Sequence, residues 1–301
     1  MIPSTNDSEI GGRGPQVCKP RKGRHPLIRT LDHFGGRTIL GKLITWMARR
    51  ETGKDIRIFY DEVWMYRIGQ RYLAKSAELS YPRSVSIDRA YRALYENCTD
   101  FWFYVYKPKI GDIIVDVGAG SGLDAPAFSE AVGGDGRVLA IEANPWTFRL
   151  LAKQRIWNQL NNMDVYQYAI MGRAGSVIIE DNRAAHTANR VVQGVAAIGP
   201  CMEVPAITLD EFCDLNGIDH IDFLKMNIEG AERCAIRGMQ KILPRIQHIC
   251  IACHDFLGDV DPKYRTRDEV IDFLRQSGFK VIQRDDPRDY VRDHVHGVRE
   301  G

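Results

Sequence analysis

GDIIVDVGAGSG, at residues 111–122, decides the fold class of this chain. Its β-branched run between glycine turns predicts a short buried strand. A helical segment follows at 123–132, and RVLAIEAN at 137–144 predicts a second strand. Asn144 and Pro145 then suit the N-cap and the first position of a second helix. This alternation of strand and helix is typical of a parallel sheet that helices cover on both faces.

The alternation continues toward the C-terminus. Further strands are predicted at residues 163–171, 176–181, 202–208, 221–228, 248–256, 279–284 and 289–298. Helices are predicted after the capping box TLDE at 208–211, at 231–243 and at 267–278. Only a short turn separates the last two strands, so this pair must be antiparallel. The sequence therefore predicts an α/β fold with a doubly wound, mostly parallel sheet.

The charge balance of the chain limits the classes of partner. It has 301 residues, with 41 Lys and Arg against 39 Asp and Glu, which gives a formal net charge of +2. This near-balance argues against a nucleic-acid-binding or polybasic membrane protein. No window reaches the roughly 18 apolar residues of a membrane span, and no signal peptide is recognisable. The seven scattered cysteines do not suggest a disulfide framework, so we expect a cytoplasmic protein.

Three regions differ in composition. Residues 1–35 are rich in Gly, Pro, Arg and Lys, which predicts a disordered basic tail. Residues 36–106 are aromatic and mixed, and we expect a helical and β extension that either caps a neighbouring site or only packs. Residues 107–301 contain the strand–helix alternation, interrupted by the long segment 182–200. In that segment His186 is a candidate for substrate contact, although a solvated loop histidine explains it as well.

The turn after the first strand predicts a ligand site, because ligands of open α/β sheets bind beyond the carboxyl ends of the strands. Glycines there let the backbone approach a ligand that a Cβ would exclude. A dinucleotide site would show G-x-G-x-x-G, but Leu123 stands at the third glycine position. Asp116 precedes the first glycine by two residues. This spacing favours a ligand without a pyrophosphate, with Asp116 near its amine and Glu142 accepting hydrogen bonds from both ribose hydroxyls.

These residues resemble motifs I and II of the class I methyltransferases that use S-adenosylmethionine. The segments KPKIGDIIVDVGAGSG, AIEANP, TLDEF and IDFLKMNIEGAE, in this order, resemble the FkbM-type methyltransferases over about residues 95–284. The resemblance implies a Rossmann-like sheet of seven strands with an antiparallel terminal strand. It also implies S-adenosyl-L-methionine as cofactor and mostly O-methylation of a small natural product, saccharide or glycolipid. The near-neutral charge of the chain separately predicts that no nucleic acid is the substrate.

The resemblance further implies which residues bind the cofactor. They are Asp116, Gly118, Ala119, Gly120, Ser121, Gly122, Glu142, Ala143, Asn144, Ala169 and Asn227. One position departs from the family pattern, because Asn227 stands where Asp is usual. An amide keeps one acceptor and loses the charge, which favours a role in positioning the cofactor amine or the substrate over a role as base or metal ligand.

A general base is expected near the acceptor, because a hydroxyl is a poor nucleophile until its proton leaves. His254 follows the fifth parallel strand, and the ordinary pKa of histidine suits this work, although a packing role is the alternative. Glu229 follows the fourth strand, and both it and Glu232 also suit a helix N-terminus. Catalysis is therefore assigned to His254, Glu229 and Asn227. A divalent metal ion on Asp255, Glu229 and Asn227 is left open, and no metal site is assigned.

CIACH at 250–254 matches the C-x-x-C-H pattern of haem attachment. The pattern lies in an apolar predicted strand, where residues three apart face opposite sides of the sheet. We therefore expect a coincidental match.

Other functions stay open beside the methyltransferase hypothesis of in-line methyl transfer. A nicotinamide-dependent oxidoreductase would use a similar sheet. A cofactor-binding scaffold without catalysis would tolerate Asn227 in place of Asp. A homodimer is also left open.

Overall fold

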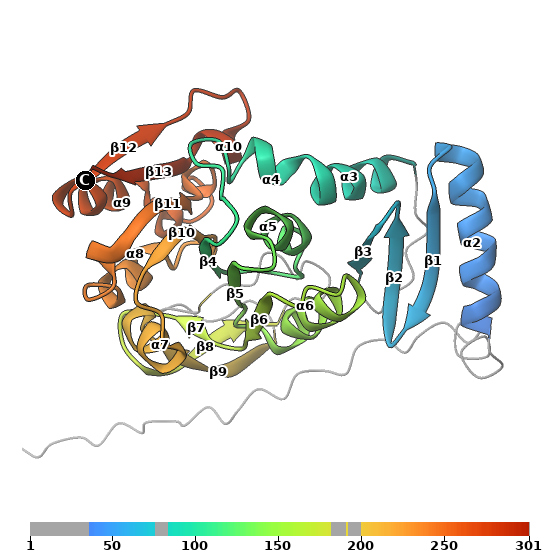
Figure 1. Ribbon diagram of the computed structural model, residues 1–301, viewed down its shortest axis with the longest axis horizontal. Helices are drawn as coiled ribbons and strands as arrows, with labels where there is room; N and C mark the ends of the chain where they lie inside the picture. The colour runs from blue at the N-terminus through green and yellow to red at the C-terminus, as the bar shows by residue number, and fades with distance from the viewer. Residues whose placement is uncertain (1–35, 76–83, 182–190, 192–199, 301) are drawn as a thin grey trace, which may run out of the picture.

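The computed structural model describes residues 36–75, 84–181, 191 and 200–300 (Figure 1). Its largest sheet has seven strands in the order β12-β13-β11-β10-β4-β5-β6. Their bounds are β4 Ile113–Val117, β5 Arg137–Ile141, β6 Met163–Tyr166, β10 Ile221–Met226, β11 Ile246–Ala252, β12 Phe279–Gln283 and β13 His294–Arg299. β13 is antiparallel to β11 and β12, and the other neighbouring pairs are parallel. The predicted fold class is confirmed.

Apolar side chains on both faces explain why these segments form central strands. In β4, Val115 lies in the core cluster on one face and Ile114 in the cluster on the other. In β10, Leu224 and Phe223 alternate in the same way. Strands that are buried on both faces need apolar residues at successive positions, which is why they read as continuous runs in the sequence.

Helices cover both faces of this sheet. They are α5 Ala125–Val132, α6 Pro145–Trp157, α7 Leu209–Asn216, α8 Glu232–Ala235, α9 Arg267–Gln276 and α10 Asp289–Arg292. Short 3-10 turns lie at Ile236–Gly238, Leu243–Arg245, Asp255–Leu257 and Pro262–Tyr264. The predicted caps are confirmed: Asn144 Oδ1 accepts from Trp146 N at 2.9 Å, and Thr208 forms a capping box with Glu211.

The predicted helix at 231–243 is wrong in length. α8 and its 3-10 turn stop at Gly238, where a side-chain Cβ would lie 2.3 Å from Met171 O. Beyond it the Asp210 carboxylate accepts from the backbone N–H of Lys241 and Ile242, so these groups do not bond within a helix. A close backbone approach and a distant carboxylate therefore end this helix, and neither is visible in local sequence.

Two predicted strands are also corrected. The segment 163–171 divides into β6 and β7 (Ala169–Ile170), because β7 leaves the main sheet to pair with β9. The segment 289–298 begins as helix α10, and only its second half forms β13. A small separate sheet has the order β7-β9-β8, with β8 at Gly175–Glu180 and β9 at Cys201–Ile207.

The described residues of the segment 36–106 form the predicted helical and β extension. It contains α2 Gly36–Thr52, β1 Ile56–Asp61, β2 Val63–Ile68, β3 Arg71–Ala74, α3 Ser84–Tyr95 and α4 Asn97–Asp100. The antiparallel sheet β1-β2-β3 docks on α6, where Gln154 Oε1 accepts from Ala74 N and Asn158 Oδ1 accepts from Tyr72 N, each at 2.8 Å. Figure 1 shows α2 beside β1 at one end of the molecule.

Two of the remaining expectations concern residues that the structure does not describe, and a third concerns cysteines of the core. The predicted tail at 1–35 and His186 lie outside the described residues. Cys250 and Cys253 belong to core clusters on opposite faces of the sheet, as expected for a coincidental haem pattern. Within the described residues, no helix is both long and apolar enough to cross a membrane.

Candidate active site

A cavity opens at the carboxyl ends of β4, β5 and β10. The predicted site residues other than Asp116, Gly122 and His254 line it. It also contacts Val191, which the structure describes within the segment 182–200, and Leu123, which packs against the core of the extension. Most of the predicted site residues therefore line one cavity, and the other three need separate explanation.

The glycine loop after β4 lies against the turn after β10. Gly118 has φ +75°, and a Cβ there would lie 2.0 Å from Asn227 O. Asn227 N in turn donates to Val117 O at 2.9 Å. No side chain fits at Gly118, so the motif glycine is required by the protein backbone itself, before any ligand is considered.

Glu142 ties the loop to the second strand. Its Oε2 accepts from Gly120 N at 2.9 Å and its Oε1 accepts from Asn144 N at 2.8 Å. Burial raises the pKa of Glu142 to about 7, against the lowering effect of these two backbone N–H groups. Because each carboxylate oxygen has a second lone pair, Glu142 can still accept hydrogen bonds from a ligand in the cavity.

Asp116 does not face the cavity, which corrects its predicted contact with a ligand amine. It is 1% exposed, and its Oδ1 lies 2.7 Å from Lys225 Nζ. Lys225 Nζ also donates to Gly118 O at 2.8 Å, from beneath the glycine loop. Burial alone would lower the pKa of Lys225, but Asp116 and Asp124 raise it, so the lysine is charged. The acid thus orients the lysine that holds the loop.

The sequence contains a signal for this pair. Lys225 follows the apolar pair Phe223 and Leu224 in the strand IDFLKM and is 2% exposed. A buried lysine needs an opposite charge, and the register places Asp116 directly beside it on β4. A lysine within an apolar strand could therefore have been matched to the acid of the neighbouring strand.

Gly122 is a packing residue, which corrects its predicted role in the ligand site. It has φ +81°, and a Cβ there would lie 2.9 Å from Leu151 Cδ1 and 3.1 Å from Gln154 Cγ. Both belong to α6. The third glycine of the motif therefore brings the loop against this helix.

His254 lies between two glutamates at the carboxyl end of β11. Its Nε2 is 3.4 Å from Glu229 Oε1 and its Nδ1 is 3.6 Å from Glu232 Oε1. Glu232 is fully buried and accepts from the N–H groups of Ile228 and Gly230 at 3.3 and 3.2 Å. We call His254, Glu229 and Glu232 the histidine cluster.

The expectation that His254 keeps the ordinary pKa of histidine is wrong. Burial would lower this pKa, but the carboxylates of Glu229 and Glu232 beside the ring raise the pKa of His254 to about 10. The imidazole is therefore protonated at neutral pH and has no lone pair to accept a proton. Sequence reasoning missed this effect because the two carboxylates reach the ring only through the turn after β10.

Glu229 has an unusual backbone conformation and lines two cavities. Its φ of +54° is in the left-handed region, which is uncommon for residues other than glycine. It lines the first cavity and also a second one beside it, which Arg233, Asp261 and Lys263 help to form. Lys263 Nζ pairs with Asp261 Oδ2 at 3.1 Å, and Arg233 Nη2 donates to Lys263 O at 2.6 Å. The turn after β10 thus brings Glu229 to the lining of both cavities.

The three oxygen ligands considered for a divalent metal ion do not line one cavity. Asn227 and Glu229 line the first cavity, but Asp255 does not. Asp255 Oδ1 accepts from the N–H groups of Thr266 and Arg267, each at 3.0 Å, at the start of α9. Its carboxylate thus satisfies a helix N-terminus.

The aromatic segment before β4 contributes residues that sequence reasoning missed. Trp102 Nε1 donates to Asp124 Oδ2 at 2.9 Å, and Asp124 lines the cavity. Burial raises the pKa of Asp124 to about 6. Lys225 Nζ lies 5.0 Å from the Trp102 ring, within the range of a cation–π contact. In the sequence, the segment FWFYVY is recognisable only as rich in aromatic residues, so it did not point to the site.

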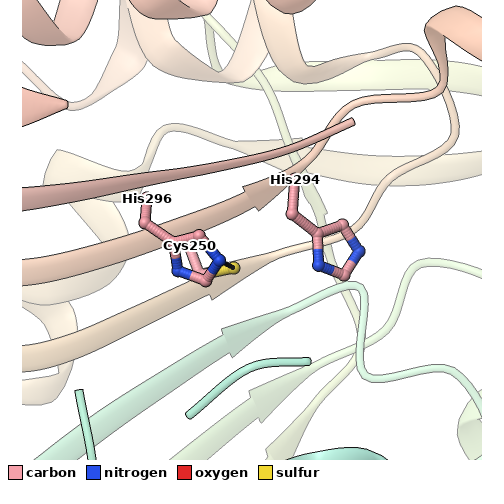
Figure 2. A group of neighbouring side chains, drawn as sticks. All are labelled: Cys250, His294 and His296. Atoms are coloured by element: carbon pink, nitrogen blue, oxygen red, sulfur yellow. Dashed lines mark hydrogen bonds between the residues drawn. The ribbon is translucent and has the colours of Figure 1, made fainter. Parts of the chain in front are cut away.

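Figure 2 shows a second group that the sequence did not predict, Cys250 on β11 with His294 and His296 on β13. Their potential ligand atoms lie within 4.8 Å of one another. Burial lowers the pKa of His294 to about 3 and of His296 to about 4, and the positive charge of Arg284 adds to both effects. Lys225 also lowers the pKa of His294. The Trp102 ring stacks on the His294 ring, with 4.8 Å between the ring centroids. The positive charges nearby also disfavour a divalent cation. We therefore assign these three residues to packing.

Comparison with known proteins gives a family match. The family model described as the methyltransferase FkbM domain matches residues 116–281, more than half of the chain. Among curated proteins, none matches this sequence.

Solved structures give distant likenesses. The methyltransferase FkbM from Methylobacillus flagellatus is 16% identical, with 69% of this chain and 47% of that chain covered and a TM-score of 0.47. Fibrillarin from Aeropyrum pernix, in complex with S-adenosyl-L-methionine, is 15% identical with 81% of each chain covered and a TM-score of 0.42. A SAM dependent methyltransferase from Aquifex aeolicus is 14% identical, with 70% of this chain and 95% of that chain covered and a TM-score of 0.38. The chain thus spans about half of the first structure, and the fold class stands on the strand order itself.

Proposed function

This chain belongs to the FkbM methyltransferase family, and from that membership we propose that it transfers a methyl group from S-adenosylmethionine to a hydroxyl of a small natural product, saccharide or glycolipid. The observation that carries the proposal is a cavity whose glycine loop and Glu142 carboxylate meet at the carboxyl ends of adjacent strands. We further propose that residues 107–301 form the cofactor-binding unit, and that residues 36–106 cap it.

The residues of the first cavity fit the cofactor. Glu142 would accept hydrogen bonds from the ribose hydroxyls, and the apolar side chains of Ile141, Ile170 and Met171 would contact the base. Asn227 Oδ1 is buried and has no hydrogen-bond partner among the described residues, so it supplies the acceptor that an ammonium group needs. The cofactor would bring an electrophilic methyl group to this cavity.

The second cavity supports an acceptor site next to the first. Its polar lining of Arg233, Asp261 and Lys263 suits a hydroxylated molecule, which presents both donors and acceptors. Glu229 lines both cavities, and its carboxylate would take the hydroxyl proton. Holding donor and acceptor in line supplies much of the rate, roughly 7 to 11 kcal/mol at its upper limit.

His254 would act through Glu229. As an imidazolium beside Glu229 Oε1, it orients the carboxylate. It does not line either described cavity, so we propose a positioning role for it in place of general base.

Calorimetry tests which cofactor the protein binds. S-adenosylhomocysteine should bind the purified full chain, and NADH should not. Glu142→Ala should weaken this binding by about 1 to 3 kcal/mol, the range for lost charge-assisted hydrogen bonds. Binding of NADH alone would support the nicotinamide-dependent oxidoreductase instead.

Transfer of a labelled methyl group to a cell extract tests catalysis. Glu229→Gln should lower the rate by about 10² to 10⁴ while S-adenosylhomocysteine still binds, because only the proton acceptor is lost. Glu203→Gln, an exposed carboxylate on β9, is the matched control and should leave the rate unchanged. A cofactor-binding protein that labels no acceptor would be the non-catalytic scaffold.

A further inference from the structure

Helix α2 has apolar side chains on its outer side as well as its inner side. Ile44 and Ala48 are buried against the sheet β1-β2-β3. Ile39, Leu43 and Trp46 are 70%, 51% and 58% exposed. Single exposed apolar residues are common, but a continuous apolar patch marks an interaction surface.

The spacing of these residues defines one face. Ile39, Leu43 and Trp46 follow one another by four and three positions, which places them along one side of the helix. The solvent side of an ordinary surface helix carries polar residues instead. We call Ile39, Leu43 and Trp46 the outer face of α2.

The charges around the outer face are positive. Lys42 and Arg50 flank it, and the Arg50 guanidinium lies 5.6 Å from the Trp46 ring centre. The one acidic residue in the sequence of α2, Glu51, follows Trp46 by five positions and so lies on another side of the helix. Upstream in the sequence, the segment KPRKGRH at 19–25 is also rich in basic residues.

We propose that α2 docks the protein on an anionic lipid surface. Ile39, Leu43 and Trp46 enter the boundary between headgroups and acyl chains, and Lys42 and Arg50 contact the negative headgroups. Tryptophan suits this depth because its ring is apolar and its N–H is polar. Helix α2 lies at one end of the described part of the molecule (Figure 1), and the exposure of Ile39, Leu43 and Trp46 leaves the outer face open among the described residues.

Two other occupants fit less well. A nucleic acid would pair with Lys42 and Arg50 but would leave three apolar side chains against a charged backbone. A second copy of the chain, related by two-fold symmetry, would bring two cationic rims together. An anionic lipid surface satisfies both the apolar and the charged side chains at once.

Sedimentation of the full chain with lipid vesicles tests the proposal and needs no methyl acceptor. The protein should sediment with vesicles of phosphatidylcholine containing about 30% phosphatidylglycerol, and the bound fraction should fall as salt is raised, because these charges are screened. Pure phosphatidylcholine vesicles should bind it at least about tenfold more weakly.

Variants separate the two contributions. Leu43→Ser with Trp46→Ser should weaken binding about tenfold or more through lost apolar contact. Lys42→Gln with Arg50→Gln should weaken binding to anionic vesicles about tenfold and leave binding to phosphatidylcholine unchanged. Leu215→Ser, at a position 73% exposed on α7, is the matched control and should bind as wild type does. Because the mutated side chains are exposed, the urea midpoints should stay close to wild type.

Three results would overturn the proposal. The wild-type chain could fail to sediment with anionic vesicles, or the double serine variant could sediment unchanged. Alternatively, equilibrium ultracentrifugation could show a dimer that Trp46→Ser dissociates, in which case a second copy covers the outer face.

Discussion

The buried pair beneath the glycine loop and the histidine cluster are two groups of opposite charges at the same edge of the sheet. Asp116 and Lys225 lie 2.7 Å apart with side chains 1% and 2% exposed. His254 and Glu229 lie 3.4 Å apart with side chains 11% and 17% exposed, and Glu229 reaches two cavities. An enclosed pair can fix a backbone, and a more open one can exchange a proton with a ligand. We therefore expect mutations of the first group to act mainly on stability, and those of the second mainly on chemistry and pH dependence.

The largest expected effect tests the enclosed pair. Lys225→Met should lower the free energy of unfolding by about 3 to 5 kcal/mol, because it leaves the Asp116 carboxylate buried without a partner. Urea unfolding measures this loss. Adding Asp116→Asn to Lys225→Met should recover most of the stability, since both charges are then gone. A loss below about 1 kcal/mol in the single variant would show that the pair is not enclosed.

The second prediction concerns the loop that this pair holds. Gly118→Ala should destabilise the fold by about 2 to 4 kcal/mol, because φ is +75° and the Cβ would meet Asn227 O. Gly120→Ala is the matched control, with φ +58° and open space around its Cβ, and should cost only about 1 to 2 kcal/mol. Equal losses in urea unfolding would contradict the close approach at Gly118.

The third prediction tests the histidine cluster by pH. A histidine whose pKa rises on folding stabilises the fold fully below its unfolded pKa, and this contribution disappears as pH rises through the folded pKa. For His254 the window runs from 6.5 to about 10, and the loss should be on the order of a few kcal/mol. Urea unfolding of His254→Gln should lack this decline. A parallel decline in the variant would assign the pH dependence to other groups.

The smallest expected effect concerns Glu142, which holds the glycine loop above the buried pair and lines the first cavity. Its pKa of about 7 means that the carboxylate ionises across neutral pH, and only the ionised form offers all its lone pairs as acceptors. Calorimetry should show S-adenosylhomocysteine binding about tenfold more weakly at pH 6 than at pH 8. Glu142→Gln should bind weakly at both values. A flat profile in the wild type would separate Glu142 from cofactor binding.

Much of the fold could be predicted because the signals are local. The capping residues Asn144 and Thr208 begin helices where expected, since a side chain that satisfies backbone N–H groups acts within three residues. The helix predicted at 231–243 failed because Gly238 meets Met171, which is far away in the sequence. Local chemistry thus set where these two helices begin, and a contact distant in the sequence set where the third one stops.

The sequence by itself determined the sheet, the glycine loop, the position of Glu142 and the family. Apolar periodicity and turn residues act over a few positions, so they can be recognised without coordinates. Only the tertiary structure decided what the charged residues do. It turned Asp116 from the predicted ligand contact into the partner of Lys225, and it surrounded His254 with two carboxylates that keep it protonated. The physical reason is that a charge responds to every group packed around it, and those neighbours come from strands and turns that are distant in the chain.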